Sequence, residues 1–258
     1  MTDVISAKIE EIVAKMDPVA LEELDAARLM RRKDVKYTLP TRSVPELLEE
    51  VKNSYRVLEI EGQRVHQYKT LYYDTPDFTM YHEHHNRRLN RYKVRIRRYL
   101  TSDISFLEVK FKNNKGETIK KRIRPNHPED LSGLESEKFV SENSPYKSSE
   151  IQPSLHNCFK RITLVHKTNT ERVTIDLELN YRPANSDRDL HLPGFSVIEI
   201  KRSRDSQPSE MITKLRSEHF HATGFSKYCM GTAMLEPRVK TNLFRSKILQ
   251  MEKMRKIS

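Results

Sequence analysis

Along much of the chain, apolar and polar residues alternate with the period of two that is typical of β-strands. In the segment RYKVRIRRY, residues 91–99, one face of the strand would be apolar except for Arg98, and the other would carry four cations. The apolar positions are Tyr92, Val94 and Ile96, and the cations are Arg91, Lys93, Arg95 and Arg97. The same period predicts eight strands, at residues 32–39, 65–73, 92–99, 104–112, 117–124, 160–167, 172–179 and 196–202.

Helical spacing of apolar residues predicts a smaller number of helices around these strands. The first 30 residues would form two amphipathic helices, broken at Pro18, that cover the sheet. Further helices are expected at about residues 44–55, 208–222 and 239–255, and the connection 125–157 has room for short ones. Mostly antiparallel strands with few helices predict a mainly β (α+β) fold, as a sandwich or a closed barrel.

Charged faces recur on the predicted strands. An ordinary sheet would turn its apolar face to the core and its charges to water. Solvated faces usually mix signs, because like charges on neighbouring positions repel, whereas residues 91–97, 110–112 and 120–124 gather cations. This grouping favours a polyanion ligand. A closed barrel with its charges inside would also explain why hydrophobic residues make up only 36% of the chain.

The net charge of the chain limits the classes of binding partner that we expect. A formal charge of +11 favours nucleic acid, anionic lipid or a phosphate-rich small molecule. Aromatic residues rarely interleave with the cations, which disfavours nucleic acid. Cys158 and Cys229 have no metal-like spacing and indicate a reducing compartment. We find no leader peptide and no apolar run of roughly 20 residues, so we expect a soluble, cytoplasmic protein without a membrane segment.

Four carboxylates lie on the same predicted faces as the cations: Asp34, Glu108, Asp176 and Glu199. Mg²⁺ and Mn²⁺ take hard oxygen ligands from one or two carboxylates and from substrate phosphates. Lys and Arg side chains hold the remaining phosphate charge. A cationic surface with a few acids therefore predicts phosphate chemistry assisted by Mn²⁺ or Mg²⁺.

Seven segments, taken in order, resemble the catalytic domain of the vacuolar transporter chaperone (VTC) family, polyphosphate polymerases of the triphosphate tunnel metalloenzyme superfamily. They are RKDVKYTLP, LYYDT, MYHEHHNRRLNRYKVRIRRY, FLEVKFKNNKGETIKKRIRP, RVTIDLELNYR, FSVIEIKR and FSKYCMG. The resemblance implies an eight-stranded antiparallel closed tunnel barrel with flanking helices. It also implies a tunnel domain at residues 29–236, after N-terminal amphipathic helices (1–28) and before a basic C-terminal helix or tail (237–258).

The resemblance also implies roles for individual residues. The phosphate ligands would be Lys36, Arg95, Arg97, Lys110, Lys120, Arg122, Arg172, Lys201 and Lys227. The residues that act in catalysis would be Lys36, Arg95, Arg97, Lys110 and Glu199. Glu199 falls at the position of the family's metal-binding glutamate, and Asp176 and Glu108 are candidates either for the metal or for holding the lysines.

Two departures from related tunnel enzymes favour polymerisation over plain hydrolysis. Arg32-x-Asp34-x-Lys36 stands in place of Glu-x-Glu-x-Lys, and Glu199-x-Lys201 stands where RNA triphosphatases need two glutamates. The expected activity is transfer of the γ-phosphate of ATP to a growing chain, with ATP and inorganic polyphosphate or triphosphate as partners. Two alternatives remain open: a tripolyphosphatase or nucleoside triphosphatase of the same fold, and a non-catalytic polyphosphate-binding module.

Overall fold

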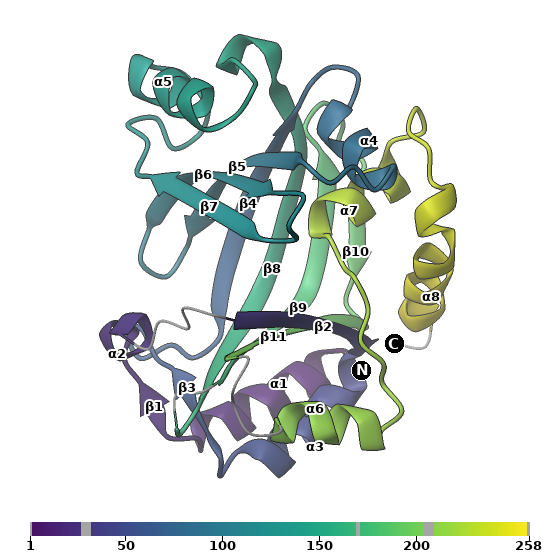
Figure 1. The fold of residues 1–258 in the computed structure, drawn as a ribbon. Helices are drawn as coiled ribbons and strands as arrows, with labels where there is room; N and C mark the ends of the chain where they lie inside the picture. Colours follow the sequence, from purple (N-terminus) through teal and green to yellow (C-terminus); the bar gives the residue numbers. More distant parts are fainter. Residues whose placement is uncertain (1, 27–31, 169–170, 204–208, 257–258) are drawn as a thin grey trace.

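The computed structural model describes residues 2–26, 32–168, 171–203 and 209–256, which form one large sheet with helices around it (Figure 1). The strands are β1 (Pro18–Val19), β2 (Arg32–Pro40), β3 (Tyr55–Leu58), β4 (His66–Asp74), β5 (Arg91–Tyr99), β6 (Ile104–Lys112), β7 (Thr118–Ile123), β8 (Gln152–His166), β9 (Glu171–Pro183), β10 (Leu190–Leu192) and β11 (Phe195–Ser203). The α-helices are α1 (Thr2–Ala14), α2 (Leu21–Ala26), α3 (Val44–Val51), α4 (Thr79–His85), α5 (Leu134–Asn143), α6 (Glu210–Ser217), α7 (Lys227–Leu235) and α8 (Arg245–Lys256).

The eight predicted strands form the main path of the sheet, in the order β2-β11-β9-β8-β4-β5-β6-β7. Every neighbouring pair on this path is antiparallel. Strand β6 has the predicted bounds, whereas β8 begins at Gln152, inside the segment expected to be a connection. Strands β1, β3 and β10 lie off this path, where β3 pairs with β8 and β10 pairs with β9.

The predicted closed barrel is not confirmed. Within the described ranges the pairing runs from β2 to β7, and no ladder joins these two end strands. Strand β7 has only six residues and belongs to a hairpin that lies apart from β2 and β11 in Figure 1. The backbone groups that a closing ladder would need therefore do not meet.

The apolar faces of the strands pack outward against helices. On one side, Ile198, Ile175 and their neighbours on β2, β9 and β11 form a core with α1, α3 and α6, which lie together below these strands in Figure 1. On the other, Leu107 and Val94 of β6 and β5 pack with Phe139 of α5. The sheet thus buries its apolar face under helices and leaves its polar face on the inner side.

Most helices follow the apolar periodicity. Helices α1 and α2 are separated by β1, which contains Pro18, and α3 ends before the predicted boundary because the chain enters β3 at Tyr55. Helix α6 begins where the Ser209 hydroxyl accepts a hydrogen bond from the Ile212 amide at 3.0 Å, an N-cap contact. Helices α4 and α7 were not predicted. No helix in the described ranges is both long and apolar enough to span a membrane.

Candidate active site

The inner side of the sheet gathers most of the predicted site residues, and we call it the charged face. Directly opposed residues on antiparallel strands point to the same side, so the register arranges this face in rows. One row joins Lys36 of β2, Glu199 of β11, Thr174 of β9 and Thr163 of β8. The next rows of this half contain Asp176 opposite Arg161, and Lys201 opposite Arg172.

The second half of the charged face lies on β5, β6 and β7. Arg95 is opposite Glu108, and Glu108 is opposite Arg122. The neighbouring rows bring cations directly opposite one another, in the pairs Lys93–Lys110, Lys110–Lys120 and Arg91–Lys112. The four cations that alternate along β5 thus share the face predicted for them.

The two halves face each other across the inner side. Desolvation by surrounding protein, together with Lys93 and Lys36, lowers the pKa of Lys110 to about 7, although the residue is exposed to solvent. Lys36 is on β2, at the opposite end of the pairing path from the β6–β7 hairpin, so the sheet curves to bring these strands together. The curvature also explains why Glu108 and Asp176 are each only 1% exposed.

Asp176 is the centre of one ion-pair cluster. Its carboxylate accepts hydrogen bonds from Arg161 Nε at 2.5 Å and Nη2 at 2.9 Å, and a further contact from Lys227. Burial alone would raise the pKa of Asp176, but Arg161 and Lys227 lower it well below its usual range. Asp176 therefore stays ionised and orients both cations.

Helix α7 brings Lys227 to the charged face from outside the sheet. The Ser226 hydroxyl caps this helix by accepting from the Cys229 amide at 3.2 Å, and it also accepts from Lys93 Nζ at 2.7 Å. Burial lowers the pKa of Lys227 to about 8, against the opposing influence of Asp176. The beginning of α7 is thus held directly against β5 and β9.

Glu108 is the centre of a second cluster. It accepts from Arg95 Nε at 2.6 Å and forms an ion pair with Lys120. Burial would raise the pKa of Glu108, but Arg95, Arg97 and Lys120 lower it well below its usual range. Like Asp176, this carboxylate is ionised and contacts two cations.

Glu199 differs from these two acids. Its oxygens lie 3.4 Å from Lys36 Nζ and 3.8 Å from Lys201 Nζ, beyond the usual hydrogen-bond range. Its side chain is 18% exposed. Burial would raise its pKa, but Lys201, Lys36 and other cations lower it well below its usual range. Glu199 is therefore an ionised carboxylate whose oxygens remain able to accept further ligands.

These carboxylates fit a metal that is shared with a ligand. Across the described ranges, no three Asp, Glu, His or Cys side chains come together as a metal cage. Mg²⁺ is commonly held by one or two carboxylates and completed by substrate phosphates. Glu199 meets that requirement, whereas close contacts with cations already occupy Asp176 and Glu108.

Aromatic rings support the cations between the two halves. The rings of Tyr68 and Phe159 are stacked with their centroids 5.2 Å apart. Arg97 and Arg161 lie over both rings at 5.1 to 5.8 Å, and Lys227 lies over Phe159 at 4.6 Å, within cation–π range. The guanidinium groups are thus held in place by the protein itself.

Two of the nine predicted phosphate ligands lie at the margins. Arg122 is exposed, with its guanidinium 4.4 Å from the ring centre of Phe106. Arg172 donates a hydrogen bond to the backbone carbonyl of Leu24 in α2. The other seven lie along the two facing halves: Lys36, Arg95, Arg97, Lys110, Lys120, Lys201 and Lys227.

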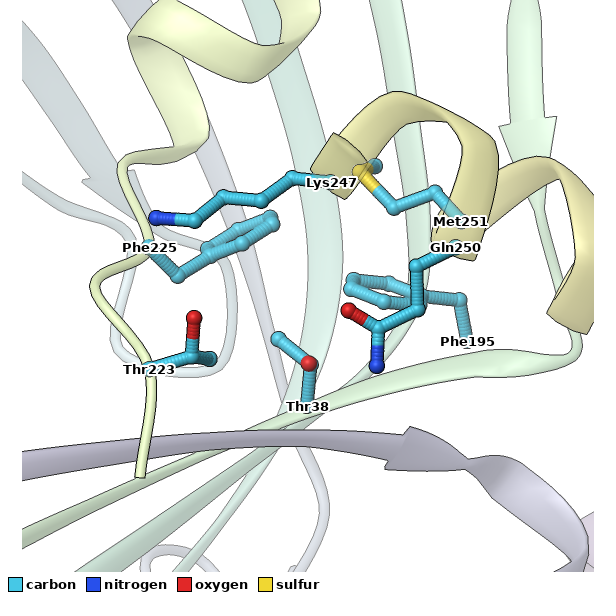
Figure 2. Close-up of a pocket in the computed structure, with 7 residues that line it drawn as sticks. All are labelled: Thr38, Phe195, Thr223, Phe225, Lys247, Gln250 and Met251. Atoms are coloured by element: carbon cyan, nitrogen blue, oxygen red, sulfur yellow. The ribbon is translucent and has the colours of Figure 1, made fainter. Parts of the chain in front are cut away.

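A small pocket beside α8 is separate from this cluster. Figure 2 shows Lys247, Gln250 and Met251 of α8 lying toward Thr38 and the segment that precedes α7. Lys247 donates to the Gly224 carbonyl. The pocket's lining includes no carboxylate within the described part of the chain, so we assign it to the packing of α8 and not to metal chemistry.

A family model described as the VTC domain matches residues 31–236, most of the chain. The chain belongs to the VTC domain family. The match spans the whole charged face, from β2 to the end of α7. No curated protein matches the chain.

Solved structures are also similar to this chain, at low sequence identity. A candidate adenylate cyclase from Bacillus halodurans is 10% identical, with 76% of this chain and 96% of that chain covered and a TM-score of 0.50. A candidate adenylyl cyclase from Hippeastrum, with a dominant triphosphatase activity, is 16% identical, with coverage of 81% and 99% and a TM-score of 0.46. At 10% identity, the similarity to the Bacillus halodurans structure concerns the fold alone.

Several residues of the charged face were not predicted from the sequence. Arg161 alternates with Ile162 in a strand, and that alternation is the signal that could have identified it. Tyr68 and Tyr72 are harder to find, because an aromatic residue in a strand usually indicates the core side. The Tyr72 hydroxyl lies 3.4 Å from Arg95 Nη1 on this face.

Proposed function

We propose that this VTC-domain protein is a metal-dependent polyphosphate polymerase that transfers the γ-phosphate of ATP to a growing chain on the charged face. The observation that carries the proposal is the set of opposed cations on β5, β6 and β7: Lys93–Lys110, Lys110–Lys120 and Arg91–Lys112. Like charges directly opposite one another destabilise a sheet. A bound polyanion offsets that repulsion.

The extent of the charged face supports a chain as ligand. Arg91 and Arg97 are six residues apart on β5. At about 3.4 Å per residue, the cations between them cover about 20 Å along this strand. That is longer than three linked phosphates. A site for ATP alone would not need cations along this whole length, whereas a site for ATP beside a second polyanion would.

The chemistry would be a direct phosphoryl transfer. A terminal oxygen of the chain forms a bond to the γ-phosphorus of ATP, the bond from that phosphorus to the β–γ bridging oxygen breaks, and ADP leaves with the electron pair. Lys36, Arg95, Arg97 and Lys110 would hold the phosphates in line and stabilise the transferring group by charge. No covalent enzyme intermediate is needed.

The acids would divide the remaining roles. Glu199 would hold a Mn²⁺ or Mg²⁺ ion together with phosphate oxygens, and that ion supplies charge neutralisation and polarisation of the phosphoryl group. Asp176 and Glu108 would orient cations, because each already contacts two of them. Glu199 would be the better metal ligand, because its ion pairs with Lys36 and Lys201 are longer, at 3.4 and 3.8 Å.

Hydrolysis by the same site is the second candidate. The side chains of Lys36 and Lys120 are 31% and 38% exposed, and they lie on β2 and β7, the two end strands of the pairing path in the described ranges. Water therefore reaches both halves of the charged face, and water at the attacking position would give a triphosphatase.

One experiment separates these functions. The purified protein is incubated with ATP and Mn²⁺ or Mg²⁺, and the products are analysed for long chains and for free phosphate. The polymerase produces chains and ADP. Free phosphate without chains would indicate the triphosphatase, and binding of polyphosphate without any turnover would indicate a non-catalytic module.

A further inference from the structure

Thr174 has a buried hydroxyl whose hydrogen-bonding capacity is unused. The residue is 5% exposed, and among the described residues no group hydrogen-bonds to its Oγ1 atom. Buried hydroxyls in folded proteins nearly always have a partner, because leaving one unpaired is costly. The position of Thr174 therefore needs an explanation.

The location of this hydroxyl points to a ligand. Thr174 lies on β9 directly opposite Glu199, in the same row as Lys36. Along its own strand, Arg172 and Asp176 flank it on the same side. Thr174 is an uncharged donor amid charged groups, next to Glu199, whose contacts with cations are longer than those of Asp176 and Glu108.

We propose that the Thr174 hydroxyl donates a hydrogen bond to a phosphate oxygen of a triphosphate or polyphosphate bound beside Glu199. Thr174 would then be a positioning residue that fixes one phosphate relative to that carboxylate. The bond removes the cost of an unpaired hydroxyl only when the phosphate is present, so it favours the bound state. This inference rests on the proposed function, because it assumes a phosphate chain on the charged face.

Two substitutions separate the hydroxyl from the shape of the side chain. Thr174→Val keeps the branched shape and removes the donor, whereas Thr174→Ser keeps the donor and loses a methyl group. We expect Thr174→Val to raise the Kd for tripolyphosphate, measured calorimetrically without metal, about tenfold, as for loss of a hydrogen bond to a charged group. Thr174→Ser should stay within about threefold of the unsubstituted protein.

The melting temperature without ligand provides a second readout. Thr174→Val should melt no lower than the unsubstituted protein, because it removes an unpaired buried hydroxyl. Thr232→Val is the matched control: Thr232 on α7 is 2% exposed and its hydroxyl also lacks a partner among the described residues. That variant should bind tripolyphosphate unchanged.

The outcomes are distinguishable. If the unsubstituted protein binds tripolyphosphate and Thr174→Val binds it equally well, the inference is wrong while the proposed function stands. If Thr174→Ser weakens binding as much as Thr174→Val, the role is one of shape, and the inference is again wrong. If the unsubstituted protein does not bind tripolyphosphate, both fail together.

Discussion

At the scale of single residues, the three innermost carboxylates of the charged face differ in their contacts. Asp176 and Glu108 have cations at hydrogen-bonding distance, whereas the cations nearest Glu199 are 3.4 and 3.8 Å away. Composition alone could not separate these roles, because all three acids alternate with apolar residues in the same way. The separation depends on which strands meet.

Glu199→Gln tests the assigned metal ligand. The substitution keeps the size of the side chain and removes the charge that would hold the divalent ion. We expect the rate of phosphate transfer to fall by about 10²-fold or more, the scale of a lost electrostatic contact to the transition state, with little change in melting temperature. Glu129→Gln, the same change at an exposed surface residue, should retain full activity. A Glu199→Gln rate above about a tenth of the original would contradict the assignment.

The lysines of the charged face predict a pH dependence of binding. Desolvation lowers the pKa of Lys110 to about 7 and of Lys120 and Lys227 to about 8. An anion favours protonated lysine, so binding raises these pKa values and takes up protons. Affinity for tripolyphosphate is therefore expected to be highest below pH 7 and to weaken from pH 7 to pH 9.

Calorimetry at constant ionic strength checks this dependence. Loss of protons by the ligand itself adds negative charge and acts in the opposite direction, so weakening with rising pH can be attributed to the protein. Lys110→Gln should flatten the pH profile. A Kd that stays constant or falls from pH 7 to pH 9 would rule out lysine titration as the cause.

At the scale of elements, the seating of α7 depends on Gly231. A Cβ atom at this position would lie 2.7 Å from Leu155 Cδ2 and closer still to the ring of Tyr181. Gly231→Ala should therefore displace α7, lower the free energy of unfolding by about 1–3 kcal/mol and weaken tripolyphosphate binding through Lys227. Denaturant titration and calorimetry measure both effects.

Gly224→Ala is the matched control for that substitution. Its added Cβ would have Lys247 Nζ at 3.5 Å as its nearest contact, an ordinary van der Waals distance. We expect a change in stability within about 0.5 kcal/mol. Equal destabilisation by the two variants would show that close packing of α7 is not the reason for glycine at position 231.

Two adjacent lysines on β7 allow the two faces of the sheet to be compared in one experiment. Lys120 lies on the charged face opposite Lys110, while the adjacent Lys121 lies opposite Val109 on the other side. Both side chains are exposed. Polyphosphate should protect Lys120 from acetylation, as measured by mass spectrometry, and leave Lys121 reactive. Equal protection of both lysines, or of neither, would mean that the ligand does not follow the charged face.

The periodicity of apolar and polar residues predicted the strands better than the helices. All eight strands of the main path were found, because apolar and polar residues alternate along most of them, and on β9 and β11 the apolar face is covered by helices. Helix α7 was missed because it is buried nearly all round, so it shows no amphipathic period. The start of β8 was missed because Pro153 and Ser154 lie within it, and both usually indicate a connection.

At the scale of the whole molecule, the curvature of the sheet creates the site. It brings Lys110 of β6 close enough to Lys36 of β2 for their charges to interact, although these strands are far apart in the pairing order. The sequence predicts which side of each strand is charged. It does not predict whether the end strands pair, since that depends on the summed twist of all the strands between them.

The central claim is that the charged face holds ATP and a phosphate chain together, and a labelling experiment tests it most directly. The protein is given ATP labelled at the γ-phosphate, Mn²⁺ and polyphosphate of defined length. The account predicts label in chains longer than the added one, with moderate salt weakening this extension more than ATP binding, because polyanion binding is screened by salt. Label found only in free phosphate, whatever chain is added, would contradict the account.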